Sequence, residues 1–163
     1  MDKHDMVKSA SILKPPSVLA AKALGGVVDI CAAELTSSLT RRKDLDSLIG
    51  PGNVNLVETN HINHFRYIAS LAALYDPLSF VEIVIWVFRT YRAHGFAVDY
   101  WEIMLPEAKT ALRKHLDPSV AVEIEPFHDW LLAHIADFKI LSDEGESLFE
   151  SMSSLGGHHA PGK

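Results

Sequence analysis

The pattern of hydrophobic and polar positions predicts an all-α chain. Apolar residues recur every three or four positions over long stretches, and no segment alternates in the way a half-buried strand does. The segments with this helical period lie at about residues 17–43, 54–75, 77–94, 98–115 and 118–141. We expect them to form one helical domain, which spans residues 17–141.

Helix-breaking residues mark the borders of these segments. Gly50-Pro51-Gly52 is typical of a turn, and Gly95 is expected to end a helix. Asp76-Pro77 and Asp117-Pro118 are expected to start helices, because proline is well accommodated in the first helical turn.

The two ends of the chain differ from the middle. Lys14-Pro15-Pro16 separates residues 1–16 from the domain, and we expect a flexible N-terminal tail there. Residues 142–163 form a C-terminal extension. Its end, residues 151–163, is rich in Ser, Gly and His and is expected to be disordered.

The segment Phe80–Phe88 is apolar on nearly every face of a helix. Such a helix is expected in the middle of a fold, with neighbours on several sides. Five or more helices around one buried helix favour a globin-like arrangement over a simple four-helix bundle. The predicted fold is therefore all-α and globin-like.

Composition limits the possible partners. The length of 163 residues fits one domain, and the formal net charge of −6 argues against a general nucleic-acid binder. The one basic cluster, residues 41–43, is explained by a solvated helix end. No apolar run is long enough to cross a bilayer, and the N-terminus has no apolar signal-peptide core. We expect a cytoplasmic protein with neither a nucleic-acid nor a membrane partner.

The single cysteine, Cys31, excludes an internal disulfide framework and a Cys-rich metal site. It lies in the apolar stretch Val27–Leu35, which predicts a buried and inert thiol. The sequence also has no G-x-S-x-G, no Walker-type loop and no dinucleotide fingerprint. We therefore expect a binding protein rather than an enzyme.

Glu82, Trp86 and Arg89 share one helical stripe within and just after the apolar run. The stripe is either a solvent face or the wall of a cleft that offers a carboxylate, a flat apolar surface and a cation. A buried carboxylate without a partner would be costly, which supports the first interpretation.

Glu58, His61 and His64 share a face of another predicted helix. They form either a polar helix start with exposed histidines or the lining of a pocket. A pocket of this kind could donate and accept hydrogen bonds near neutral pH. The family resemblance described below favours the pocket.

A di-metal site is an alternative for the same region. The Glu-x-x-His pattern of di-iron bundles occurs at residues 58–61 and 125–128, and Glu34 and Glu102 could supply the further ligands. Pro126 lies inside the second pattern, and such pairs arise easily by chance. We therefore predict no metal site.

Three segments of the chain resemble the phycobiliproteins. Residues 48–55 (LIGPGNVN) are similar to the family's LIQPGGNA, residues 65–76 (FRYIASLAALYD) to LRYVTYAILAGD, and residues 89–95 (RTYRAHG) to ETYQALG. Their order and approximate spacing agree with the family over about residues 17–140. The resemblance implies a globin-like protein that binds linear tetrapyrroles, or bilins, and assembles as dimers.

The family anchors its bilin through a cysteine at the position of Val57. An aspartate that faces the pyrrole nitrogens is replaced by Asn60, and an arginine for a propionate by Thr59. The resemblance therefore implies that a bilin, biliverdin or a phycobilin, binds without a covalent bond. A carboxylate would stabilise a protonated, cationic bilin, and Glu58 and then Glu82 are the candidates.

The family's helix-end tyrosine is retained as Tyr91. The predicted ligand-binding residues are Val57, Glu58, Asn60, His61, His64, Tyr67, Glu82, Trp86, Arg89 and Tyr91. We expect a homodimer, to which the stretch 18–39 contributes unless it serves only the core. The resemblance implies a carrier or partner of a bilin-synthesising enzyme, as in stand-alone phycobiliprotein-like globins associated with bilin synthesis in non-photosynthetic bacteria.

Residues 95–101 also resemble the start of a helix in globin-coupled sensors. At the position of the haem-binding histidine of these sensors the chain has Tyr91, and His94 lies nearly a turn away, so haem is the less favoured ligand. The alternative function is a haem-free sensor or regulatory domain that acts through a small apolar ligand or a protein partner.

Overall fold

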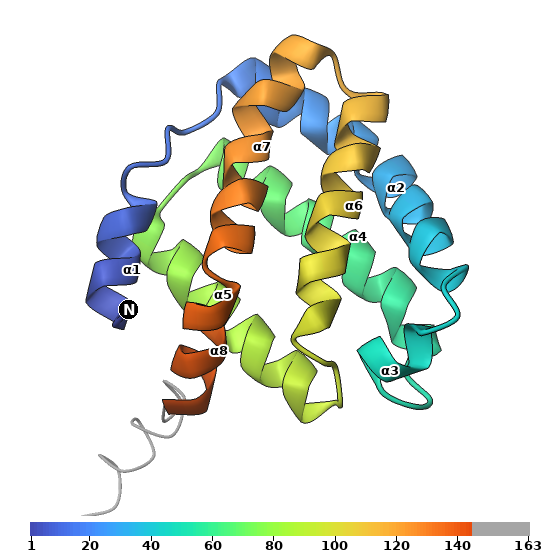
Figure 1. The fold of residues 1–163 in the computed structure, drawn as a ribbon. Coiled ribbons are helices and arrows are strands. Elements are labelled where there is room, and N and C mark those ends of the chain that lie inside the picture. Colours follow the sequence, from blue (N-terminus) through green and yellow to red (C-terminus); the bar gives the residue numbers. More distant parts are fainter. Residues whose placement is uncertain (145–163) are drawn as a thin grey trace, which may run out of the picture.

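The computed structural model describes residues 1–144, which form helices and their connections without any strand (Figure 1). The helices are α1 (Lys3–Ala10), α2 (Val18–Thr40), α3 (Leu45–Ile49), α4 (Val54–Ala73), α5 (Pro77–Ala93), α6 (Asp99–His115), α7 (Pro118–Ala133) and α8 (Ile135–Glu144). The prediction of an all-α chain is confirmed.

The helices form two layers around one core. α2 packs along α4 and also contacts α6 and α7, whereas α5 packs against α8 and α1. α6 and α7 lie side by side and cross in front of α4 and α5 in Figure 1. Fully buried apolar side chains from all these helices meet between the layers, among them Leu24, Leu35, Phe65, Phe80, Leu112 and Phe127.

The helix borders predicted in the middle of the chain are confirmed. Asp76 and Asp117 cap α5 and α7, because their side chains accept hydrogen bonds from the backbone amides of Ser79 and Ser119. Gly95 follows α5 with a φ of +96°, a left-handed conformation that glycine adopts without strain.

The prediction of a flexible tail over residues 1–16 is wrong for α1. Asp2 caps this helix, and both Met6 and Ala10 are fully buried. α1 packs against α5, and the hydroxyl of Tyr75 donates to the carbonyl oxygen of Ala10 at 2.7 Å. This segment is too short for its apolar residues to show a clear helical period in the sequence.

One of the predicted helices is shorter in the structure than predicted, and another is divided. The segment predicted at 17–43 ends as α2 at Thr40, and the short helix α3 follows it. The segment predicted at 118–141 is interrupted at His134, which lies between α7 and α8. The predicted disordered end falls outside the described residues.

The prediction that Phe80–Phe88 forms a central helix is wrong. On α5, the side chains of Val84 and Phe88 are buried, but Ile83 and Trp86 are 39% and 56% exposed. The sequence did not reveal that one side of this helix is exposed. The exposed positions are apolar like the buried ones, so no polar face marks the solvent side.

Two turns that belong to the segments resembling phycobiliproteins lie against each other. A Cβ atom added to Gly50, whose φ is +81°, would lie 3.0 Å from the carbonyl oxygen of Gly95. The amide of Asn53 donates to the carbonyl oxygens of Ile49 and His94 at 2.8 Å and 2.6 Å. These contacts hold the beginning of α4 against the end of α5.

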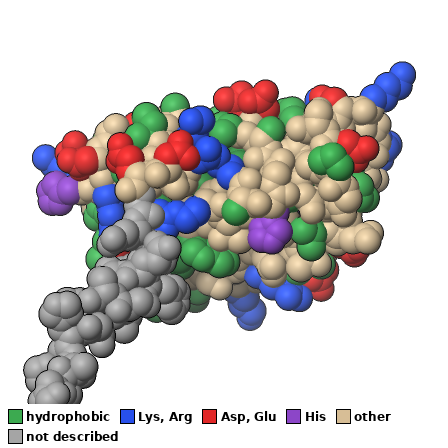
Figure 2. Space-filling view, turned by 90° about the horizontal axis from the view of Figure 1, so that it is seen from below, with side chains coloured by type: hydrophobic (Ala, Val, Ile, Leu, Met, Phe, Trp, Pro, Cys, Tyr) green, Lys and Arg blue, Asp and Glu red, His purple; other side chains and the backbone are tan. Residues whose placement is uncertain are grey.

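The surface carries mixed charges. Hydrophobic side chains form small separate groups among charged ones on the face shown in Figure 2. Within residues 1–144, no helix combines the length and the hydropathy that a bilayer crossing requires. The basic cluster at residues 41–43 follows the end of α2, as predicted, and Arg42 pairs there with Asp44.

Candidate functional site

α4 turns two histidines towards the interior. Its buried positions, which include Val57, His61, Phe65 and Ile68, follow the helical period. His61 is fully buried, and His64, which borders this row, directs its ring to α7. The interpretation as exposed histidines is therefore wrong. The proposal that they line a ligand pocket stays a prediction.

The ring of His61 is held between two helices. Its Nδ1 lies 2.8 Å from the hydroxyl of Thr36 on α2, and its Nε2 lies 3.1 Å from the hydroxyl of Tyr100 on α6. Burial lowers the pKa of His61 to about 3, so the ring is neutral at pH 7. A neutral imidazole has one donor and one acceptor nitrogen, and the two hydroxyls satisfy both.

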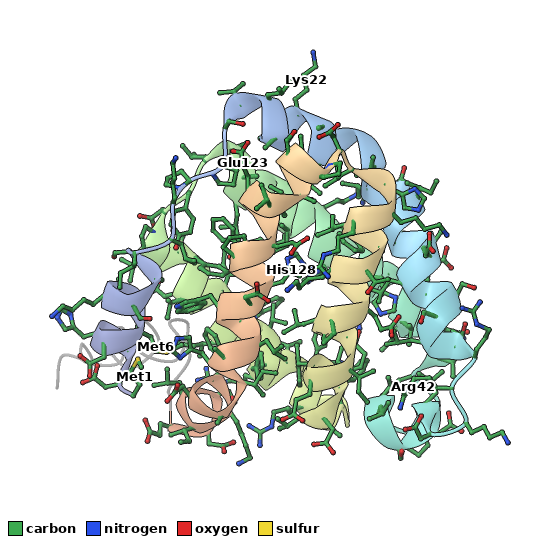
Figure 3. The ribbon with its side chains drawn as sticks, turned by 45° about the horizontal axis from the view of Figure 1, so that its top comes forward. Met1, Met6, Lys22, Arg42, Glu123 and His128 are labelled. Carbon is green, nitrogen blue, oxygen red and sulfur yellow. The ribbon has the colours of Figure 1, made fainter. Side chains whose placement is uncertain are left out.

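A second imidazole pair joins α4 to α7. Nε2 of His64 lies 3.0 Å from Nε2 of His128, which is at the centre of the fold (Figure 3). Burial lowers the pKa of His64 to about 3 and that of His128 to about 4, and the charge of Lys109 adds to the effect on His128. In the described part of the chain, the buried Nδ1 of His128 has no hydrogen-bond partner.

Aromatic side chains of α5, α6 and the connection between them pack around the ring of Tyr100, the residue whose hydroxyl lies beside His61. Tyr91 lies against Phe96 and Tyr100, with ring centroids 5.0 Å and 6.4 Å apart, and Phe88 stacks on Trp101 at 4.0 Å. Burial raises the pKa of Tyr91 to about 12 and also raises the pKa of Tyr100 well above its usual value, so both phenols keep their protons. Apolar rings around a few neutral polar groups are typical of sites for flat organic ligands.

The other predicted residues of α4 differ from the two histidines and from one another in burial. Val57, at the position of the family's cysteine, is fully buried. Glu58 is exposed beside the inward face, and Asn60 is half-buried on the flank. The hydroxyl of Tyr67 donates to the carbonyl oxygen of Phe80 over a long 3.4 Å.

The predicted stripe on α5 lies at the surface. Glu82 pairs with Lys3 of α1, Trp86 is more than half exposed, and the Nε of Arg89 lies 3.3 Å from the carbonyl oxygen of Ser142. The solvent-face interpretation therefore describes this stripe. Glu82 and Arg89 are thus engaged with α1 and α8, and in this arrangement the structure does not bring the stripe into contact with the histidines of α4.

Two of the four carboxylates proposed as metal ligands are engaged in ion pairs. Glu34 pairs with Lys114 and His115, and Glu125 pairs with Arg113. The histidines of the two Glu-x-x-His patterns bind the hydroxyls and the imidazole described above. Across residues 1–144, no three carboxylate, imidazole or thiol groups converge in the manner of a metal site.

The prediction of a buried thiol at Cys31 is confirmed. Its side chain is fully buried, and its Sγ lies 3.7 Å from the carbonyl oxygen of Ala111 on α6. Burial raises the pKa of Cys31 to about 11, so the thiol is protonated and a poor nucleophile at neutral pH.

The histidine nearest to a haem-binding position does not face the interior. His94 is exposed, and its Nδ1 lies 2.7 Å from the carbonyl oxygen of Thr90, one turn earlier. Tyr91 is the residue of this helix end that lies among the aromatic rings. Its raised pKa disfavours the tyrosinate form that a haem iron would need.

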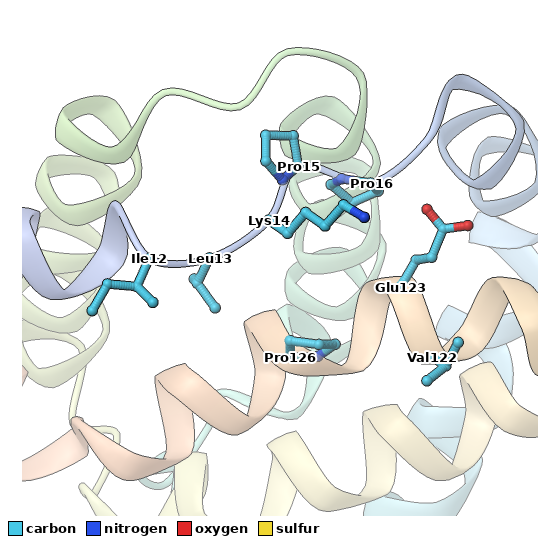
Figure 4. Close-up of a pocket in the computed structure, with 8 residues that line it drawn as sticks. All are labelled: Ile12, Leu13, Lys14, Pro15, Pro16, Val122, Glu123 and Pro126. Carbon is cyan, nitrogen blue, oxygen red and sulfur yellow. The ribbon is translucent and has the colours of Figure 1, made fainter.

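A pocket of about 300 Å³ lies in a different part of the molecule, between α7 and the segment that connects α1 to α2 (Figure 4). It is lined by Ile12, Leu13, Lys14, Pro15, Pro16, Val122, Glu123 and Pro126. Glu123 closes one side, because its carboxylate accepts hydrogen bonds from the amide and the hydroxyl of Ser17 at 2.7 Å and 3.0 Å. Sequence reasoning missed the pocket because it assigned the connecting segment to a tail.

Comparison with known proteins identifies no relative of this chain. No family model, no curated protein and no solved structure matches it. The resemblance to phycobiliproteins therefore rests on its three segments and stays a prediction. What the structure shows is an all-α chain with a buried, neutral histidine and aromatic interior.

Proposed function

We propose that this chain is a non-enzymatic, globin-like binding protein of the phycobiliprotein type that holds a bilin without a covalent bond. The observation that supports the proposal is the direction of His61 and His64, which face inward from α4. These neutral imidazoles and the aromatic rings of α5 and α6 offer apolar surface with a few hydrogen-bonding groups. Val57 in place of a cysteine excludes a thioether at that position.

The chemistry of these side chains suits a bilin, but their present contacts occupy them. His61 already bonds to Thr36 and Tyr100, and His64 bonds to His128. Binding would require these hydrogen bonds to open, so that the imidazoles turn to the pyrrole and carbonyl groups of the pigment. The apparent affinity is then reduced by the small fraction of open protein, and we expect slow association.

Charged groups at the border would complete the site. Glu58, exposed beside the inward face, is available as the counter-ion of a protonated bilin. Arg89 would have to leave the carbonyl oxygen of Ser142 to reach a propionate. The proposed protein is cytoplasmic, acts as a homodimer and delivers or accepts its pigment at a bilin-synthesising enzyme.

The test is a titration of the purified protein with biliverdin, a phycobilin and haemin, followed by visible spectroscopy. A saturable, red-shifted and sharpened bilin band supports the proposal, and an unchanged bilin spectrum contradicts it. A Soret shift would favour haem instead. The pigment must separate from the chain in acidic urea, since retention would indicate a covalent bond.

Variants connect the spectrum to the residues. We expect Glu58→Gln to shift the band of bound bilin, because it removes the proposed counter-ion from an exposed position where folding is not at risk. Glu102→Gln, an equally exposed change on α6, is the matched control and leaves the band in place. Cys31→Ala preserves binding.

A haem-free regulatory domain that responds to a small apolar ligand is the second candidate. The pocket beneath the segment connecting α1 to α2 favours it, because its lining is mainly apolar and its volume of about 300 Å³ suits a small molecule. Saturable binding of a short fatty acid that is weakened by Val122→Asp, together with unchanged bilin spectra, would support this candidate over the first.

A further inference from the structure

One face of α2 is covered by no other part of the described chain. The exposed residues on this side recur at helical spacing, opposite the buried side of the helix that faces α4 and α6. They are Val18, Lys22, Gly25, Gly26, Asp29 and Ala33, and we refer to them as the α2 outer face. Lys22 projects away from the body of the molecule in Figure 3.

The two glycines of this face are not required by any close contact within the described chain. A Cβ atom added to either Gly25 or Gly26 would meet no atom of residues 1–144 within 4 Å. Glycine inside a helix is less stable than alanine by about 0.5–1 kcal/mol, so the pair weakens α2 without improving any internal contact. What a glycine pair does permit is the close approach of another backbone.

The charges on this face are arranged symmetrically about the glycines. Lys22 precedes Gly25 by the same number of residues as Asp29 follows Gly26, and Val18 and Ala33 are related in the same way. Neither Lys22 nor Asp29 has an ion-pair partner within residues 1–144. At about 1.5 Å of rise per residue, they are too far apart along the helix to pair with each other.

A second copy of this chain is the occupant that matches this symmetry. If two α2 helices lie antiparallel around a two-fold axis between Gly25 and Gly26, Lys22 meets the partner's Asp29 and Asp29 meets the partner's Lys22. A parallel arrangement would instead place Lys22 against Lys22, which is repulsive. Leu19 and Ile30, 71% and 51% exposed, border the face and would add apolar area.

We propose that two copies of this chain pair through the α2 outer face, with antiparallel α2 helices that cross at Gly25 and Gly26. This inference specifies the surface of the homodimer that belongs to the proposed function. The contact is small and has few large apolar side chains, so the dimer is expected to dissociate on dilution in the micromolar range. Its ion pairs are exposed, so salt weakens it.

Charge exchange tests the pairing, with the dimer dissociation constant measured by sedimentation velocity on the full chain. We expect Lys22→Asp and Asp29→Lys to weaken the dimer at least tenfold each, because either change sets like charges against each other twice. The double variant restores the dissociation constant to within a few-fold. An equimolar mixture of the two single variants forms a heterodimer, because opposite charges meet at both contacts.

Controls separate this surface from general charge effects and from folding. Lys43→Asp and Asp46→Lys change exposed residues outside the face and leave the dimer intact. Gly25→Leu combined with Gly26→Leu blocks the crossing at two exposed positions where an added Cβ has open space among residues 1–144, so we expect a monomer of undiminished thermal stability.

The inference is overturned if the wild-type chain remains monomeric at concentrations of hundreds of micromolar, if the single variants dimerise as the wild type does, or if charge exchange fails to restore pairing. None of these measurements uses a pigment. Absence of bilin binding would therefore contradict the proposed pigment-binding function and leave the pairing intact, whereas a monomeric wild type would contradict the pairing and the homodimer and leave the proposed bilin binding intact.

Discussion

The side-chain amide of Asn53 donates a hydrogen bond to the backbone carbonyl oxygen of His94 over 2.6 Å, although the two residues are 41 positions apart. The same amide donates to the carbonyl oxygen of Ile49. The turn that precedes α4 is thereby joined to the turn that follows α5. Since α4 carries the inward histidines and α5 carries Tyr91, this contact fixes the two sides of the candidate site relative to each other.

We predict that Asn53→Ala lowers the free energy of unfolding by about 1–2 kcal/mol, because two carbonyl oxygens lose their shared donor. Asn53→Asp should be worse, since a carboxylate would face the same oxygens. Urea denaturation followed by circular dichroism measures both. Asn55→Ala, at an exposed position in the first turn of α4, is the control, and equal losses for Asn53→Ala and Asn55→Ala would refute the role of the amide.

The backbone contact between Gly50 and Gly95 gives a second prediction. Gly50→Ala is expected to destabilise the fold by about 2–3 kcal/mol, because alanine strains a positive φ and its Cβ would lie 3.0 Å from the carbonyl oxygen of Gly95. Gly52→Ala has a similar φ of +84° but open space around it, so only the strain of about 1 kcal/mol remains. The difference between the urea midpoints of unfolding of these two variants measures the contribution of the steric contact.

Acid should unfold this protein through its interior histidines. The folded chain keeps His61, His64 and His128 neutral down to pH values of about 3, 3 and 4, whereas the unfolded chain protonates them near pH 6.5. The unfolded state therefore binds more protons below pH 6.5, and stability is lost as the pH falls from there towards 4. Each ring contributes up to about 1.4 kcal/mol per pH unit.

The slope of stability against pH checks this effect. Unfolding free energies measured in urea at pH 7.5, 6.5 and 5.5 should decline most steeply between the last two values. His128→Gln is expected to reduce that slope even if it destabilises the protein at every pH. His4→Gln, at an exposed position on α1, leaves the slope unchanged. A flat profile down to pH 5 would show that the buried rings accept protons in the folded state.

Removal of a single hydroxyl probes the bond between His61 and Tyr100. We expect Tyr100→Phe to cost about 1–2 kcal/mol, because Nε2 of His61 is left buried without a partner. Tyr67→Phe removes the same group, but from a long 3.4 Å contact to a carbonyl oxygen, and should cost less. Equal effects in thermal denaturation would indicate that the His61 bond is not specifically stabilising.

Substitution of the exposed Trp86 on α5 tests whether a pigment binds in the interior or on the surface. Trp86→Ala is expected to change stability by less than about 0.5 kcal/mol, whereas Trp101→Ala, which removes a buried ring stacked on Phe88, should cost about 3–5 kcal/mol. If the pigment binds among the interior rings, Trp86→Ala leaves its affinity unchanged. A large loss of bilin affinity in this variant would instead place the pigment on the surface stripe.

The sequence predicted helices correctly where a capping residue borders a segment with helical hydrophobic period. Asp76, Asp117 and Gly95 mark real helix borders because capping depends on the residue itself and its immediate neighbours. α1 was missed because a short helix is stabilised mainly by packing, here the burial of Met6 and Ala10.

The candidate site was less accessible to sequence reasoning. The face of α4 follows from its period, so the shared side of His61 and His64 could be predicted. Their partners could not, since Thr36, Tyr100 and His128 lie on three other helices whose packing is non-local. The signal for His128 was its place on the apolar face of α7, at helical spacing from Ile124 and Leu131, but sequence reasoning treated it only as half of a Glu-x-x-His pattern.

The single thiol of Cys31 allows local opening of the folded protein to be measured. A reagent such as a disulfide dye can attack only after the packing around the sulfur opens, because the side chain is fully buried against α6 and burial raises the pKa of the thiol to about 11. The labelling rate under native conditions thus reports how often the packing around Cys31 opens. Since each chain offers a single reactive atom, the rate needs no correction for other sites.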